Sequence, residues 1–197
     1  MFVMSLVCVM GRTSLCQAEA MGGKRAPAFT LTDAEGQKRS LSEFQGKFVV
    51  LEWFNYDCPF TRKHYASGNM QQLQRMYTAK GVVWLSINSS APGKQGTLTP
   101  ETAKQRSTEQ KIASTAVLLD SSGKVGRIYG AKTTPQLFII DPEGTVIYTG
   151  AIDDKPSVDP ADISTAKNYV QRALDEALAG KPVSVAETRS YGCSVKY

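Results

Sequence analysis

The stretch FVVLEWFNYDCPFT, residues 48–61, joins a strongly apolar run to a cysteine and a proline. Residues 48–54 are almost continuously apolar and rich in β-branched and aromatic side chains, which is typical of a strand buried on both faces. Pro59 suits the first turn of a helix, where its missing N–H costs no hydrogen bond. The stretch therefore predicts a buried strand that leads directly into a helix, with Cys58 at the junction.

Working outward from this junction, apolar spacing predicts the remaining elements. The helix continues to about Tyr77, with a disturbance at Gly68-Asn69, and residues 23–47 form an entry segment with a turn at 33–36. Further elements are a buried strand over 82–87, a helix over 100–110, a short strand over 116–119, a hairpin of strands 136–140 and 145–149, and an amphipathic helix over 166–179. This order predicts one α/β domain with a central mixed sheet and helices on both faces.

Length and composition agree with a single globular domain that has one hydrophobic core. The 197 residues are 42% hydrophobic and carry a formal net charge of +5. Because the Lys and Arg residues are scattered rather than grouped with aromatic residues, the charge predicts a solvated surface and no nucleic-acid partner.

The first twenty residues differ from the rest. Residues 2–10 are apolar and the segment ends Ala18-Glu19-Ala20, a pattern that resembles a secretory signal peptide cut after Ala20. No Lys or Arg precedes the apolar run, so a disordered N-terminal tail is the alternative. We expect a signal peptide over 1–20, a domain over 24–182 and a tail over 183–197, and therefore an exported, periplasmic protein with no membrane span after cleavage.

Cleavage would remove Cys8 and Cys16 and leave Cys58 and Cys193 in the mature chain. Two cysteines in an oxidising compartment can pair. Cys193 lies in the tail, among apolar residues that a solvated terminus does not need. We expect this tail either to dock and offer Cys193 as a resolving thiol to Cys58, or to leave it as a free or intermolecular thiol.

The position of Cys58 predicts a reactive thiol. At a helix N-terminus, free N–H groups and the helix dipole favour an anion, and these conditions lower a thiol pKa. Thr61 faces the same side of the helix and could donate to the sulfur, and Arg62 could add positive charge. The alternative is a buried structural cysteine that caps the helix.

Two distant features support function. Glu52 lies inside a strand that is otherwise wholly apolar, and a buried carboxylate needs partners or a role as a proton carrier. Thr133-Thr134-Pro135 immediately precedes the strand 136–140, and proline at a strand entrance needs a reason. The single histidine, His64, lies six helical residues from Cys58 and so off its face. With so few ligands the sequence predicts no metal and no cofactor.

The chain resembles the thioredoxin superfamily, in its redoxin branch of peroxiredoxin-like (AhpC/TSA-like) proteins. Cys58-Pro59-Phe60-Thr61 falls on the Cys-x-x-Cys motif, with Cys58 on the nucleophilic cysteine. The resemblance implies a thioredoxin-like fold, a Thr134–cis-Pro135 pair that lies against Cys58 and holds substrate with Pro59, and a buried acid at Glu52. The chain departs from the motif at Thr61, which replaces the second cysteine.

These features favour an exported thiol–disulfide oxidoreductase with Cys58, Thr61, Glu52 and Cys193 in its catalytic site. Its partners would be a thiol or disulfide protein or a small thiol. Two alternatives stay open. One is a weak thiol peroxidase, although the peroxide-activating residues of peroxiredoxins are not present in recognisable form. The other is a non-catalytic binding module that uses the groove beside Pro135.

Overall fold

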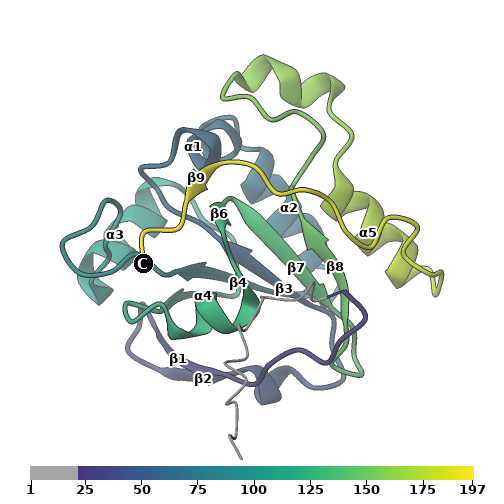
Figure 1. Ribbon diagram of the computed structural model, residues 1–197, viewed down its shortest axis with the longest axis horizontal. Coiled ribbons are helices and arrows are strands. Elements are labelled where there is room, and N and C mark those ends of the chain that lie inside the picture. The colour runs from purple at the N-terminus through teal and green to yellow at the C-terminus, as the bar shows by residue number, and fades with distance from the viewer. Residues whose placement is uncertain (1–21) are drawn as a thin grey trace, which may run out of the picture.

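The structure is a computed structural model that describes residues 22–197 (Figure 1). The segment predicted to be a signal peptide, with Cys8 and Cys16, lies outside the described residues, so export stays a prediction. Within the described part, no helix combines the length and the apolar character that crossing a membrane requires.

A seven-stranded sheet forms the centre, in the spatial order β2-β1-β5-β4-β3-β7-β8. Its strands are β1 (Thr30–Asp33), β2 (Lys38–Ser40), β3 (Val49–Trp53), β4 (Val83–Asn88), β5 (Ala116–Leu119), β7 (Gln136–Ile140) and β8 (Val146–Gly150). The three central strands β5, β4 and β3 are parallel, whereas β7 and β8 continue the sheet antiparallel and β1 and β2 do so at the other edge. The predicted mixed sheet is confirmed.

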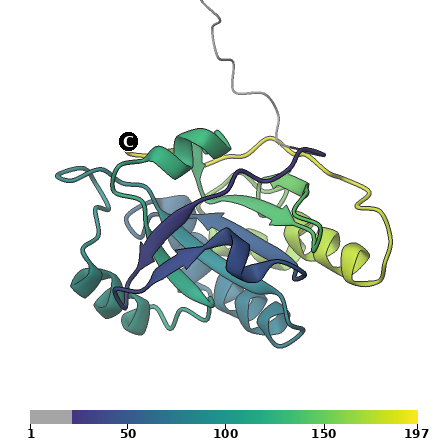
Figure 2. The ribbon, with the colours of Figure 1, turned by 90° about the horizontal axis from the view of Figure 1, so that it is seen from below.

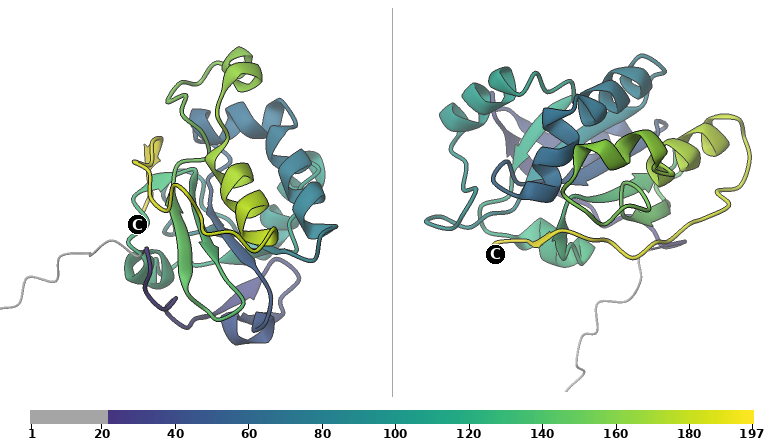
Figure 3. Two further views of the ribbon diagram at one scale, coloured as in Figure 1. Left: turned by 90° about the vertical axis from the view of Figure 1, so that its right-hand side faces the viewer. Right: turned by 90° about the horizontal axis from the view of Figure 1, so that it is seen from above.

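Helices cover both faces of this sheet, as predicted. They are α1 (Pro59–Ala66), α2 (Asn69–Thr78), α3 (Pro100–Glu109), α4 (Lys124–Tyr129) and α5 (Tyr169–Leu178), with 3₁₀ helices η1 (Leu41–Phe44) and η2 (Pro160–Thr165). Leu73 of α2 and Leu174 of α5 pack on one face, and Tyr129 of α4 packs on the other. Figure 2 and the left view of Figure 3 show the sheet between these two layers.

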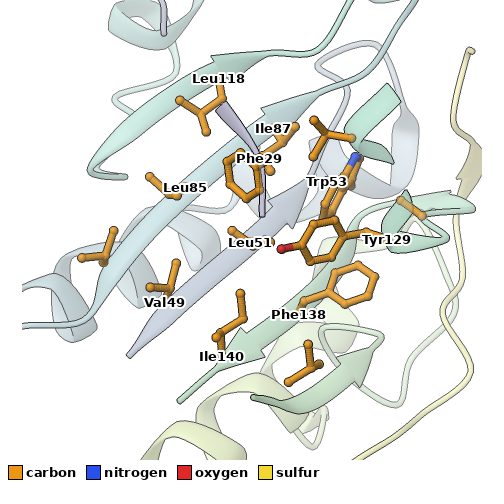
Figure 4. Close-up of a cluster of buried hydrophobic side chains, with 14 of the residues drawn as sticks. Phe29, Val49, Leu51, Trp53, Leu85, Ile87, Leu118, Tyr129, Phe138 and Ile140 are labelled. Atoms are coloured by element: carbon orange, nitrogen blue, oxygen red, sulfur yellow. The ribbon is translucent and has the colours of Figure 1, made fainter. Parts of the chain in front are cut away.

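The alternation of side chains along β3 explains why its sequence is apolar throughout. Val49, Leu51 and Trp53 point into the cluster on the α4 side, which also holds Phe29 and Phe138 (Figure 4). Val50 points into the cluster under α1, α2 and α5. Because side chains of a strand alternate between faces, a strand covered on both sides needs apolar residues at nearly every position. Glu52 is the exception on β3.

Several elements were missed or misplaced by the sequence patterns. The entry segment contains β1 and β2, and the short helix α4 was not predicted. The predicted long helix is two helices, α1 and α2, because Gly68 adopts a left-handed conformation with φ 78° at the disturbance foreseen there. The last helix begins at Tyr169 rather than at 166, since Asn168 caps it by accepting a hydrogen bond from the Gln171 N–H.

The C-terminal tail is docked along its length. After α5 it runs back past β8 and β7 to the short strand β6 (Thr133–Thr134), with which its own strand β9 (Cys193–Ser194) pairs antiparallel (Figure 1, yellow). Thr149 of β8 exchanges backbone hydrogen bonds with Ala186 and Thr188. Val195 is buried in the cluster on the α4 side, so the end of the chain contributes to the core.

Candidate active site

Cys58 occupies the N-cap of α1, directly after the buried strand β3. Its carbonyl accepts the first helical hydrogen bond, from the Arg62 N–H at 2.9 Å, and Pro59 follows at the first helical position. The side chain is fully buried, with 0% exposure. The thiol therefore lies at the positive end of the helix dipole without contact with bulk solvent.

The loop before β7 supplies the opposite wall of the site. The Thr134–Pro135 peptide bond is cis, as the family resemblance implies. The Cys58 thiol donates to the Thr134 carbonyl oxygen, with Sγ and O 3.0 Å apart. Cys58, Thr134 and Pro135 are thus brought together from segments 76 residues apart in the chain.

The tail brings Cys193 to the same place. In the pairing of β6 with β9, Cys193 is the register partner of Thr134, whose carbonyl accepts from Cys58. Gly192 allows this approach, because a Cβ built there would lie 2.1 Å from the Thr134 carbonyl oxygen. Gly192 also has φ 132°, a conformation that other residues rarely adopt. Both cysteines are free thiols.

The two thiols move each other's pKa in opposite directions. Burial raises the pKa of Cys58, and the polar groups around its sulfur, first those of the Thr134 and Cys193 side chains, lower it. The backbone groups of Thr61 and Cys193 add to them, so the Cys58 pKa is lowered. Burial and the bond with Cys58 raise the pKa of Cys193 to about 11. The arrangement favours a thiolate at Cys58 and a protonated thiol at Cys193.

Hydroxyl groups near the cysteine lack acceptors. Thr61 and Thr134 are 1% and 2% exposed, and the Oγ1 atoms of both, like that of Thr133, have no well-aligned hydrogen-bond partner. Buried polar groups are normally paired, so these hydroxyls have hydrogen-bonding capacity left for a further acceptor. Thr61 contributes to the Cys58 pKa through its backbone, whereas the sequence had suggested its hydroxyl.

Glu52 lies on the α1 and α2 side of β3, in a cage of donors. It accepts hydrogen bonds from Tyr65 Oη (2.7 Å), Gln74 Nε2 (3.1 Å), Trp84 Nε1 (2.8 Å) and Ser86 Oγ (3.0 Å). Complete burial raises its pKa, and the four hydrogen bonds oppose this rise. The predicted requirement for partners is met, and two of them, Tyr65 and Trp84, are aromatic residues whose polar atoms point at the carboxylate.

Other predicted contributors lie elsewhere. Arg62 is exposed and is not among the groups that shift the Cys58 pKa. His64 is buried and contacts Asn69, Tyr191 and Asp153 rather than Cys58. Across residues 22–197, no group of three or more His, Cys, Asp or Glu side chains is placed to hold a metal ion.

Sequence reasoning missed the polar group that receives the tail. Tyr191 donates to Asp153 Oδ1 at 2.5 Å, and its ring meets Phe60 of α1 edge-on, with centroids 5.9 Å apart. The indication in the sequence was weak. Apolar residues around Cys193, Tyr191 among them, are unusual in a solvated tail, but nothing in the sequence linked Tyr191 to Asp153.

Comparison with known protein families gives an independent view. The model described as the AhpC/TSA family matches residues 22–149, a range that contains Cys58 and the cis-proline but ends before the tail. The thiol-disulfide oxidoreductase ResA of Bacillus thuringiensis is 30% identical over 125 residues, which are 64% of this chain and 66% of that protein. The chain thus spans about two thirds of that relative. ResA of Halalkalibacterium halodurans is 26% identical over 138 residues, 69% of this chain and 73% of that protein.

Solved structures extend the likeness beyond the family match. An uncharacterized protein from Geobacillus kaustophilus superimposes with a TM-score of 0.77 at 28% identity and covers 91% of this chain and 93% of its own. A hypothetical protein of Sinorhizobium meliloti gives 0.75 at 28%, covering 89% and 93%. A protein from Chlorobium tepidum proposed to be thiol:disulfide interchange protein DsbE gives 0.54 at 28%, covering 65% and 83%. The thioredoxin-like fold is confirmed.

Proposed function

The chain belongs to the AhpC/TSA family, and on this premise we propose that it is an exported thiol–disulfide oxidoreductase with Cys58 as nucleophile and Cys193 as resolving thiol. The observation that carries the proposal is the adjacency of the two thiols: Cys193 is the register partner of Thr134, whose carbonyl accepts from Cys58, and the two thiols move each other's pKa in opposite directions. Relatives named thiol-disulfide oxidoreductase support the same chemistry.

The reaction begins at the Cys58 thiolate. It attacks one sulfur of a partner disulfide, forms a mixed disulfide and expels the second partner sulfur as a thiolate, which takes up a proton. Cys193 then loses its proton and attacks Cys58, so that a Cys58–Cys193 disulfide forms and the first partner sulfur leaves as a thiolate. The partner disulfide gains two electrons, and the protein loses them.

An external dithiol resets the protein by reducing the Cys58–Cys193 disulfide to two thiols and becoming a disulfide itself. Run in reverse, the same steps oxidise a dithiol partner. Glu52 is proposed to assist by accepting or donating protons, as its burial and raised pKa allow. Thr134 and Pro135 are proposed to line the place where the partner sulfur approaches, together with Pro59.

A time course of oxidation by glutathione disulfide tests this proposal. The mature protein is treated with one equivalent of oxidised glutathione, quenched with acid at intervals and analysed by mass spectrometry. We expect a transient glutathione adduct on Cys58 followed by a Cys58–Cys193 bridge. The adduct should persist in Cys193→Ser, and Cys58→Ser should form neither the bridge nor a comparably fast adduct. A Cys58 that stays unmodified would instead support a non-catalytic binding module.

A second candidate, thiol peroxidase, is favoured by the unpaired hydroxyls of Thr61 and Thr134. Here Cys58 would take one oxygen of a hydroperoxide to form a sulfenic acid, releasing an alcohol or water, and Cys193 would condense with it to a disulfide and water. Substoichiometric hydrogen peroxide should then give the bridge at a rate that falls in Thr61→Val. A rate no faster than that of free cysteine would exclude this activity.

A further inference from the structure

The tail crosses open space just before it reaches the active site. Between Thr188 and Cys193 it borders a cavity of about 630 Å³, whose lining includes Asp153, Tyr169 and Gly192. Before the crossing, Thr188 Oγ1 is fixed by the Ala151 N–H at 2.9 Å. After it, β9 pairs with β6. The crossing itself therefore lacks continuous support from packing.

Tyr191 fastens the middle of this crossing. Within the crossing, residues 189–192, only the Tyr191 side chain makes hydrogen bonds to the described residues. Its hydroxyl donates to Asp153 Oδ1 at 2.5 Å and lies 3.4 Å from His64 Nε2. Its ring contacts Phe60. Phe60 and His64 both belong to α1, the helix that begins after Cys58. The fastening thus ties the tail to the element that carries the nucleophile.

The acceptor of this bond is itself fixed. Asp153 is 3% exposed, and its Oδ1 also accepts from the Lys155 N–H at 2.9 Å. Its Oδ2 lies 3.9 Å from His64 Nε2, and His64 is held in turn by Asn69 through a 2.9 Å contact at Nδ1. A buried carboxylate with several fixed neighbours holds the hydroxyl in one place, and hydrogen bonds to such groups are among the stronger ones.

Tyr191 and Cys193 flank Gly192, where the chain bends with φ 132° before β9 begins, so the position of Tyr191 fixes where the chain turns toward Cys193. Gly192 between them is pressed against the Thr134 carbonyl. We propose that Tyr191, held by Asp153, is a positioning residue that keeps the Cys193 sulfur within reach of Cys58 for the resolving step. This inference rests on the proposed function, because it assigns the residue that makes the resolution of the mixed disulfide fast.

The test compares Tyr191→Phe, Asp153→Asn and the double variant with the unaltered protein. Tyr191→Phe keeps the ring contact with Phe60 and removes only the hydroxyl. Tyr169→Phe is the matched control, because it removes a tyrosine hydroxyl from the lining of the same cavity and leaves the Tyr191–Asp153 bond in place. The measured quantity is the rate at which the Cys58–glutathione adduct converts to the Cys58–Cys193 bridge, followed by acid quench and mass spectrometry.

We expect each single variant to slow this conversion about tenfold or more, the range expected for a hydrogen bond to a buried charge. The double variant should be no slower than the slower single variant, because both changes act on one bond: Tyr191→Phe removes its donor and Asp153→Asn removes the charge of its acceptor. The second measurement is the pH profile of Cys58 alkylation, which should move to higher pH when the Cys193 donors withdraw. The Tyr169→Phe control should match the unaltered protein in both.

Two failures are distinguishable. If the unaltered protein forms the bridge and Tyr191→Phe and Asp153→Asn form it equally fast, the positioning role is wrong and the proposed function stands. If the unaltered protein forms no bridge, the resolving step of the proposed function fails. In that case the pH profile of Cys58 alkylation in Tyr191→Phe and Asp153→Asn tests the positioning role. A profile equal to that of the unaltered protein overturns this role, and a profile shifted to higher pH supports it. Slowing that Tyr169→Phe reproduces would also overturn it, as a general packing effect.

Discussion

At the scale of single residues, the proposed chemistry depends on how one buried sulfur, that of Cys58, is stabilised as an anion. Burial alone would raise the Cys58 pKa and keep the thiol inert. Donors from Thr134, Cys193 and the first turn of α1 reverse that effect. The tail is thus part of the nucleophile's environment before any oxidation takes place.

Removal of the tail thiol should weaken this stabilisation. In Cys193→Ala the Cys58 sulfur loses the donor of the partner thiol, and we expect its pKa, which is lowered in the unaltered protein, to rise. The measurement is the iodoacetamide rate at Cys58 as a function of pH, with the modified peptide identified by mass spectrometry. Identical profiles for the two proteins would contradict the role of Cys193 as a donor.

Glu52 makes stability depend on pH in a defined direction. Its folded pKa lies above the unfolded value of about 4.3, so folding favours the protonated form. The stabilisation is therefore complete below the unfolded pKa and is lost as pH rises through the folded pKa. In Glu52→Gln, which does not titrate, this loss should be missing.

We expect the free energy of unfolding of the unaltered protein, minus that of Glu52→Gln, to fall as pH rises above 4.3, by up to about 1.4 kcal/mol per pH unit. Urea unfolding at a series of pH values from 4.5 upward measures the difference. A difference that stays constant or grows with pH would show that Glu52 is charged throughout, with its four donors outweighing burial.

At the scale of secondary structure, the buried strands were predictable because a strand covered on both faces has a nearly continuous run of apolar residues. β3, β4 and β7 are covered on both faces and are apolar at nearly every position. β6 and β9 have two residues each and are defined only by their pairing with each other, so no local sequence pattern could predict them. α4 was missed because its six residues include Gly126, whose lack of a side chain leaves room for the Tyr197 ring.

The same limit applies to the site. Cys58, Glu52 and Thr134-Pro135 could be found from the sequence because each breaks a local rule for its element. Asp153, Tyr191 and the donors around Glu52 break none, and only the folded chain brings them together. The residue proposed as nucleophile could therefore be picked out from the sequence, whereas the groups that surround the site from distant segments could not.

The pairing of β9 with β6 should fail if Gly192 gains a side chain. In Gly192→Ala the new Cβ would meet the Thr134 carbonyl oxygen, so we expect the tail to lift from β6. Hydrogen exchange measures this: the Val195 N–H, which donates to the Lys132 carbonyl, and the Ala91 N–H, which donates to the Lys196 carbonyl, should exchange faster.

Gly180→Ala is the control for this change. Gly180 also has a positive φ, 69°, but a Cβ there would meet nothing within 4 Å. It therefore imposes backbone strain without the collision. If both variants leave the exchange of Val195 and Ala91 unchanged, or both speed it equally, close approach at Gly192 is not what docks the tail.

At the scale of the whole molecule, the tail connects regions that are distant in sequence. It begins after α5, bonds to β8 through Thr188, pairs with β6, and ends with the Tyr197 ring under Arg127 of α4, whose guanidinium carbon lies 4.4 Å from the ring centroid. A disulfide between Cys58 and Cys193 would therefore close a loop that contains most of the described chain. Cross-links that close long loops restrict the unfolded chain most strongly.

The oxidised protein should accordingly be more stable than the reduced one. Loop-closure reasoning gives the Cys58–Cys193 bridge a stabilisation of up to about 5 kcal/mol, before any strain is deducted, which corresponds to a rise in Tm on the order of 10 °C for a domain of this size. Thermal unfolding of the protein with excess dithiothreitol and after oxidation with one equivalent of oxidised glutathione measures the difference.

Cys193→Ser is the control for this prediction. It should melt near the reduced protein under both conditions, because it can form only an adduct at Cys58. Since the tail is already docked with both thiols free, we expect the bridge to form without rearrangement of the fold and the gain to appear without loss of the native circular dichroism spectrum. An oxidised protein that contains the bridge but melts at or below the temperature of the reduced form would mean that the tail must leave its docked position to form it, and that Cys193 resolves Cys58 from a conformation other than this one.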